Sequence, residues 1–118
     1  MGASFLDISR RDRILTLQEI RTVAAKHLTK LTGSRGEVAL GVLLLWNDHG
    51  KEAHAIAQSN EGERDFDWLH ALVHRREGDL SNAAYWYGEM EKAAPGNTLL
   101  RRDLAEEMNC FFEYLLKG

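Results

Sequence analysis

The chain has 118 residues, of which 44% are hydrophobic and 28% charged, and its formal net charge is −3 at pH 7. This length fits one domain, and the apolar fraction argues against a disordered chain. The slight acidic excess, without a long basic run, argues against a binder of nucleic acid or of anionic membranes. A single cysteine excludes an internal disulfide and a cysteine-rich zinc site. No stretch has the character of a signal peptide or a membrane span, so we expect a cytoplasmic protein.

The spacing of apolar residues predicts helices along the chain, since no segment shows the sustained two-residue alternation of a strand. Residues 1–15 are expected to be loosely ordered, and the first helix to begin after Thr16. Thr16 and Glu19 form a capping box, in which the hydroxyl and the carboxylate each accept a hydrogen bond from an exposed backbone amide.

A second capping box is expected at residues 34–37, where Ser34 and Glu37 have the same spacing. It opens a helix that runs to about Asn47. The stretch from 42 to 46 is apolar on nearly every side of this helix, so we expect the helix at the centre of the core, with Leu44 fully buried.

Glycine-containing turns divide the rest of the chain into a short helix around 53–57 and longer helices at about 64–77, 80–94 and 98–117. The sequence therefore predicts a single all-α domain of about six helices. They form antiparallel hairpins at about 36–60 and 64–94, followed by a capping helix. Within that last helix Cys110 has apolar neighbours, which favours a buried and inert thiol.

Small residues recur at related positions of the two hairpins. Gly41 and Ala71 stand thirty residues apart in the first helices, and Ala53 and Ala83 have the same offset in the second helices. Small side chains allow two helix backbones to approach closely. This weak repeat therefore indicates that the two hairpins are built in a similar way.

From Glu77 to Pro95 the chain resembles the second half of a tetratricopeptide repeat, in which a Gly-Asp turn precedes an alanine, an aromatic residue follows and a proline closes the unit. The resemblance covers about residues 36–110 and implies a right-handed stack of hairpins that contacts other proteins. His70 and His74 stand where the repeat usually has leucine and tyrosine. The motifs LWND, HAIAQ and HALVHRREGD…NAAYWY are also similar to a family of small helical proteins, a likeness that implies no activity.

Four polar residues share one face of the predicted helix 64–77, at spacings of three and four: Asp67, His70, His74 and Glu77. Two histidines one turn apart can chelate a divalent metal, and carboxylates beside them can orient the rings. His54 and Gln58 share a face of the preceding helix, so three histidines converge if the two faces meet. The candidate metal ligands, for an ion such as zinc, are His54, His70 and His74. The candidate ligand-binding residues are His54, Gln58, His70, His74, Arg75, Glu77, Asn82 and Trp86.

Other interpretations of these residues remain open. The polar row is either a solvated helix face or a buried, hydrogen-bonded cluster without a ligand; the apolar pattern favours exposure and the repeat register favours burial. Arg75 and Arg76 either clamp an anion or complement the dipole at a helix C-terminus. Trp86, on the same side as Asn82, either lines a pocket or packs in the core.

Two functions from different classes fit the sequence. The first is a small helical module or scaffold that contacts a protein partner or a second copy of itself, without a cofactor. Its aromatic anchor would be Trp68, Trp86, or Phe112 with Leu116. The second is a ligand- or metal-binding protein, or an enzyme of unknown reaction, that uses the histidine cluster between helices. No glycine-rich phosphate loop, GxSxG or HExxH motif is present, so the sequence indicates no reaction.

Overall fold

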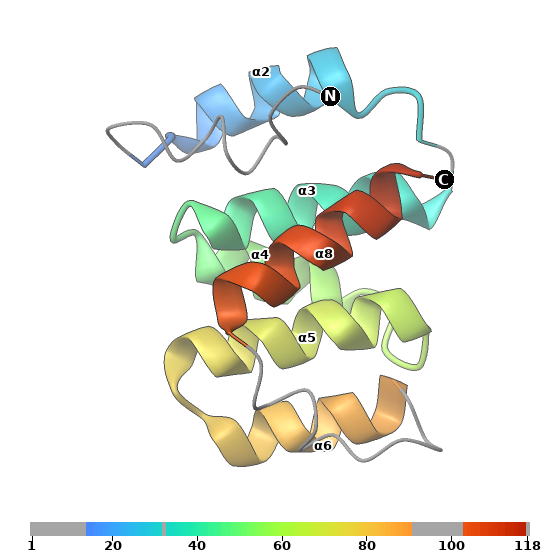
Figure 1. Cartoon of the computed structure of the whole chain (residues 1–118). Helices are drawn as coiled ribbons and strands as arrows, with labels where there is room; N and C mark the ends of the chain where they lie inside the picture. Colours follow the sequence, from blue (N-terminus) through green and yellow to red (C-terminus); the bar gives the residue numbers. More distant parts are fainter. Residues whose placement is uncertain (1–13, 32, 91–102, 118) are drawn as a thin grey trace.

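The computed structural model describes residues 14–31, 33–90 and 103–117, and in these ranges it contains helices and no strand (Figure 1). The all-α prediction is therefore confirmed. The six helices are α2 (Leu17–His27), α3 (Ser34–Trp46), α4 (Gly50–Gln58), α5 (Arg64–Glu77), α6 (Leu80–Met90) and α8 (Leu104–Leu116). Most of the segment expected to be loosely ordered, and residues 91–94 and 98–102 of the last two expected helices, lie outside the described residues.

The helix ends show which of the predicted capping residues are confirmed. Thr16 caps α2 in the expected capping box, with Glu19 N donating to its hydroxyl and Thr16 N donating to the Glu19 carboxylate. The second expected box is wrong, because the chain already turns at Gly33 (φ 60°), which takes the N-cap position. Ser34 is therefore the first helical residue of α3 and caps nothing. Gly78 ends α5 in the left-handed conformation (φ 85°), which glycine adopts without steric cost.

Helices α3, α4, α5 and α6 pack one after another as hairpin neighbours, and α3 also touches α5. Figure 1 shows α2 lying beyond α3 at one end of this row and α6 at the other, with α8 crossing the row. Helix α8 packs mainly on α3 and less on α5, so it does not simply cover the last hairpin. The hairpins are those that the sequence predicts, whereas a right-handed tetratricopeptide stack stays a prediction.

The core is centred on α3, as the sequence predicts. Leu44 is buried with 6% of its surface exposed, and its neighbours Leu43 and Leu45 are more deeply buried still. Helix α3 can be apolar on nearly every side because α2, α4, α5 and α8 all pack against it. The largest side chains of the same cluster that come from α5 and α8 are Phe66, Leu69, Leu72, Met108, Phe111, Phe112 and Leu115.

Two expectations about α8 are wrong. Phe112 is fully buried, so it is not available as an anchor for a partner. Because α8 crosses both α3 and α5, it buries a wider face than contact with one helix would require, and Phe112 falls within that face. Cys110 lies off this face and is exposed rather than buried.

The Leu69 side chain of α5 packs directly against Gly41 of α3, where an added Cβ would clash with its Cδ2 atom. Leu69 is fully buried, so relieving the clash requires the core to shift. We expect Gly41→Ala to lower the free energy of unfolding by about 1–2 kcal/mol, because the overpacking outweighs alanine's better helix propensity. Gly88→Ala in α6 meets no atom within 4 Å and should stabilise the protein by up to about 1 kcal/mol. Urea unfolding of both variants checks this, and equal effects of the two changes would contradict the tight packing of Leu69 against Gly41.

Polar side chains in the turn after α3 form hydrogen bonds with the backbone just before α2. Asn47, only 1% exposed, accepts a hydrogen bond from Leu15 N at 3.0 Å and donates to the Leu43 carbonyl at 2.9 Å. The Nε2 atom of His49 lies 2.8 Å from the Leu15 carbonyl. The LWND motif, together with the histidine that follows it, therefore holds two segments together.

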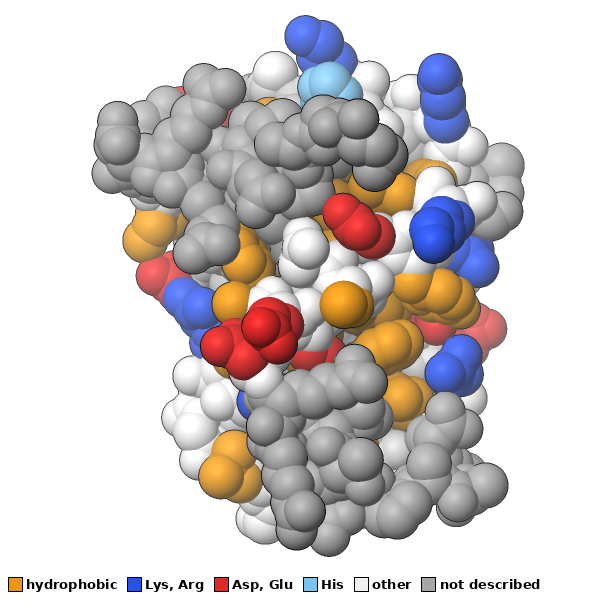
Figure 2. All heavy atoms as spheres, viewed as in Figure 1, with side chains coloured by type: hydrophobic (Ala, Val, Ile, Leu, Met, Phe, Trp, Pro, Cys, Tyr) orange, Lys and Arg blue, Asp and Glu red, His pale blue; other side chains and the backbone are white. Residues whose placement is uncertain are grey.

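The face crossed by α8 carries acidic, basic and hydrophobic side chains side by side, without one sign of charge dominating its described part (Figure 2). Among the described residues, no helix is both long enough and apolar enough to cross a lipid bilayer.

Candidate metal centre

Three histidines from two helices converge, as the sequence predicts if the faces of α4 and α5 meet. His54 comes from α4, and His70 and His74 come from successive turns of α5. The Nε2 atoms of His54 and His70 lie 2.9 Å apart, so one of these rings donates a hydrogen bond to the other. One potential ligand atom from each of the three rings lies within 4.8 Å of the other two.

Ring packing fixes the orientation of His70. The Trp86 ring from α6 stacks on it with centroids 4.0 Å apart and planes 11° apart. The His74 ring is also nearly parallel to it, at 5.0 Å and 20°, while His54 meets both histidines edge-on. The candidate Trp86 therefore belongs to the cluster, but as a support for His70 rather than as the wall of a separate pocket.

The cluster is buried at its centre and open at its edge. His70 is 3% exposed, whereas the side chain of His74 is 12% exposed. Burial, with smaller contributions from His54 and His74, lowers the pKa of His70 from 6.5 to about 4. At neutral pH this ring is therefore uncharged, which is the form that binds a metal ion.

The polar row on α5 is not one solvated face. Asp67 is buried and accepts a hydrogen bond from Gly62 N at 3.0 Å, so it closes the turn before α5. Glu77 is exposed, and its Oε1 atom lies 3.1 Å from Nδ1 of His74. Glu61, from the turn between α4 and α5, places a carboxylate oxygen 4.0 Å from Nδ1 of His70. The burial that the repeat register favours is thus confirmed for His70.

Two candidate residues lie outside the cluster. Gln58 is the last residue of α4 and is exposed, so it does not bridge to the histidines as expected. Asn82 is also exposed, and its side-chain amide donates to the Asp79 carboxylate at 2.7 Å, where it helps to begin α6. Asp79 itself lies near His74 and Glu77, and these three groups form a second, more exposed set of neighbouring ligand atoms.

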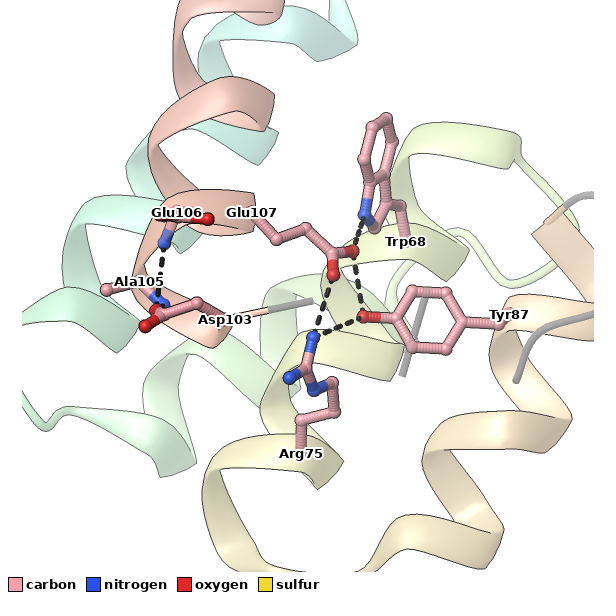
Figure 3. A network of polar contacts seen from close by, with 7 residues as sticks. All are labelled: Trp68, Arg75, Tyr87, Asp103, Ala105, Glu106 and Glu107. Carbon is pink, nitrogen blue, oxygen red and sulfur yellow. Dashed lines mark hydrogen bonds and ion pairs between the residues drawn. The ribbon is translucent and has the colours of Figure 1, made fainter. Parts of the chain in front are cut away.

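Arg75 belongs to a different site, where α5 meets α6 and α8. Its guanidinium donates to the Oε1 atom of Glu107 at 2.8 Å (Figure 3). The other oxygen of this fully buried carboxylate accepts hydrogen bonds from Trp68 Nε1 at 2.7 Å and from the Tyr87 hydroxyl at 2.8 Å. Burial also raises the pKa of Tyr87, which keeps its hydroxyl proton available for donation. Arg75 and Arg76 both lie in the last turn of α5, as the dipole interpretation expects, and each pairs with a carboxylate of the chain itself: Arg75 with Glu107 and Arg76 with Asp48.

Sequence reasoning missed Glu107, although a signal was present. It lies three residues after Leu104 and four before Phe111, so it falls within the apolar stripe of α8. A carboxylate at an inward-facing position requires buried donors. Arg75, Trp68 and Tyr87 supply them from α5 and α6, which joins three helices at one point.

No protein-family model, curated protein or solved structure matches the chain. The histidine cluster is therefore the chemical feature of the chain that points to a function. Three imidazole ligands suit zinc and neighbouring divalent transition ions, whereas calcium and magnesium prefer oxygen ligands.

Proposed function

We propose that this protein binds a divalent transition-metal ion, of which zinc is the type, between His54, His70 and His74. The observation that supports the proposal is the convergence of three histidine ligand atoms within 4.8 Å of one another at a partly buried junction of α4 and α5. Such convergence is costly for a fold without a ligand, since each buried ring nitrogen needs a hydrogen-bond partner.

The distances are close to those that a metal ion requires. Zinc–nitrogen bonds of about 2.0–2.1 Å in a tetrahedral site separate two ligand nitrogens by about 3.3 Å. The His54 and His70 Nε2 atoms, now 2.9 Å apart, would have to separate by only a few tenths of an ångström. The His74 ring would move toward them, and its partial exposure leaves room for that rotation.

The surroundings of His74 favour the same assignment. Glu77 Oε1 lies 3.1 Å from its Nδ1 atom and accepts a hydrogen bond from the N–H group there, which leaves Nε2 with a free lone pair. Carboxylates commonly orient metal-bound histidines in this way, and they also make the ring a stronger ligand. Glu77 is thus assigned to orient a ligand rather than to bind the ion.

Zinc is expected to raise the melting temperature of metal-free protein, because an ion that joins α4 to α5 binds the folded chain and not the unfolded one. At one hundred times its dissociation constant, the ion adds about 2.7 kcal/mol to the free energy of unfolding, or roughly 10 °C. His54→Ala and His74→Ala should each remove most of this shift. Differential scanning calorimetry after treatment with a chelator measures it.

His27→Ala is the matched control, because this histidine is exposed on α2, far from the cluster in the chain. It should leave the zinc-dependent shift unchanged. A wild-type protein that zinc does not stabilise, or a shift of equal size in the His74→Ala variant, would overturn the proposal.

Contact with a protein partner or a second copy of the chain, the other function that the sequence suggests, stays a prediction. Of the large hydrophobic side chains that the structure describes, Leu80 and Tyr85 on α6 are each 56% exposed and would carry such a contact. Trp68 is stacked on Phe111 and bonded to Glu107, so it is held inside the fold instead. Light scattering of the purified protein would detect a homodimer.

A further inference from the structure

We propose that Glu61 is the carboxylate that accepts a hydrogen bond from Nδ1 of His70 when the metal ion is bound. The inference rests on the proposed function and assigns to Glu61 a positioning role, not that of a metal ligand. With Glu77 on His74, it gives two of the three histidines a carboxylate partner behind the ring.

The supporting observation is an unpaired atom. Among the described residues, Nδ1 of His70 is the buried side-chain nitrogen or oxygen that has no hydrogen-bond partner. His70 is 97% buried, being 3% exposed, so solvent does not readily compensate for the missing partner. The carboxylate of Glu61 is the group facing this atom, with Oε2 at 4.0 Å.

Metal binding would change the hydrogen bonding that Nδ1 of His70 requires. In a neutral imidazole one nitrogen carries the proton and the other has the lone pair. When Nε2 of His70 turns from His54 to a metal ion, the proton must reside on Nδ1. A buried N–H without an acceptor is unfavourable. The metal-bound state therefore requires a hydrogen-bond acceptor for Nδ1 of His70, which has none in the metal-free structure.

Glu61 can reach Nδ1 of His70 by a small movement of its side chain. Its side chain is 49% exposed in the turn between α4 and α5, so it can change rotamer freely. An approach of about 1 Å brings its oxygen from 4.0 Å to hydrogen-bond distance. The backbone of the turn need not move, because Gly62 N is already held by the Asp67 carboxylate.

The other nearby carboxylates already have partners. Asp67 accepts from Gly62 N, and Glu77 lies against His74. Glu61 is thus the carboxylate that lies near Nδ1 of His70 and that can move to bond with it when the metal ion binds.

The experiment compares metal affinity in Glu61→Gln with that in Glu63→Gln, a change of the same kind two residues along the same turn. Co²⁺ is titrated into each chelator-treated protein, its visible absorption is recorded, and zinc affinity is measured by competition. Glu61→Gln is expected to bind both ions 10–100-fold more weakly than wild type. Glu63→Gln should stay within about twofold, because its exposed side chain lines a hollow with Ser34 and Tyr114, away from the histidines. Glu61→Asp, whose shorter side chain reaches less far, should lie between them.

Each other outcome has a definite meaning. Equal affinities of Glu61→Gln and Glu63→Gln would overturn this inference and leave the metal site intact. A wild-type protein that binds neither ion would instead overturn the proposed function. If Glu61→Gln shifts the Co²⁺ absorption bands, Glu61 is a direct ligand and the positioning role is wrong. The melting temperature of the metal-free variants should equal that of wild type, which separates this role from a general effect on folding.

Discussion

Replacing Glu107 with alanine is expected to lower the free energy of unfolding by about 3–5 kcal/mol. The carboxylate is fully buried and accepts hydrogen bonds from Arg75, Trp68 and Tyr87 at 2.7–2.8 Å. Its removal takes away the acceptor that the Arg75 guanidinium, the Trp68 indole and the Tyr87 hydroxyl share. Because the stability of a small domain is about 5–15 kcal/mol, the loss would be a large share of the total.

Three further variants show whether the network is the cause. Glu106→Ala changes the exposed neighbour on α8 and should cost less than about 0.5 kcal/mol. Glu107→Gln keeps an acceptor for Trp68 and Tyr87 but loses the charge opposite Arg75, so we expect an intermediate loss. Arg75→Met should cost less in the Glu107→Ala background than in wild type, since the ion pair with Glu107 is already lost there. Urea unfolding followed by circular dichroism measures all four, and a Glu107→Ala loss as small as that of Glu106→Ala would contradict the role of the network.

Leu44→Ala is expected to lower the free energy of unfolding by about 2–5 kcal/mol. Leu44 lies on the central helix and is only 6% exposed, so its truncation opens a cavity where the surrounding helices cannot close in fully. Leu80→Ala is the matched control, because the same side chain is removed from a position that is 56% exposed. Chemical denaturation of both variants tests the assignment. A Leu44→Ala loss below about 0.5 kcal/mol would mean that α3 is not the core helix.

Much of the helical framework could be predicted because its signals are local. Thr16 and Glu19 begin α2 through contacts three residues apart, and Gly78 ends α5 by its own backbone conformation. The boundaries of α5, from Arg64 to Glu77, are those that the apolar spacing and the flanking glycines indicate. The predicted N-cap at Ser34 is wrong because a glycine precedes it. The chain turns one residue earlier, at Gly33, which takes the N-cap position of α3.

The histidine cluster could be predicted only in part. Spacing places His70 and His74 on one face of a helix, but which neighbour covers that face depends on how α4 and α6 pack. The candidate residues near the histidines have different environments for the same reason. Asp67 bonds to the turn before α5, and Trp86 stacks on His70. Gln58 and Asn82 are exposed. Spacing alone does not distinguish these outcomes.

The sequence by itself determined the all-α class, the division of the described chain into helices, the apolar central helix and a set of histidines able to share one face. Each depends on residues a few positions apart, whose geometry in a helix is known in advance. Only the tertiary structure decided that Arg75 meets Glu107 across 32 residues, that His54 meets His70 across 16, and that Phe112 is buried while Cys110 is exposed. These outcomes depend on the angles at which helices cross, and those angles are set by the packing of all the side chains between them.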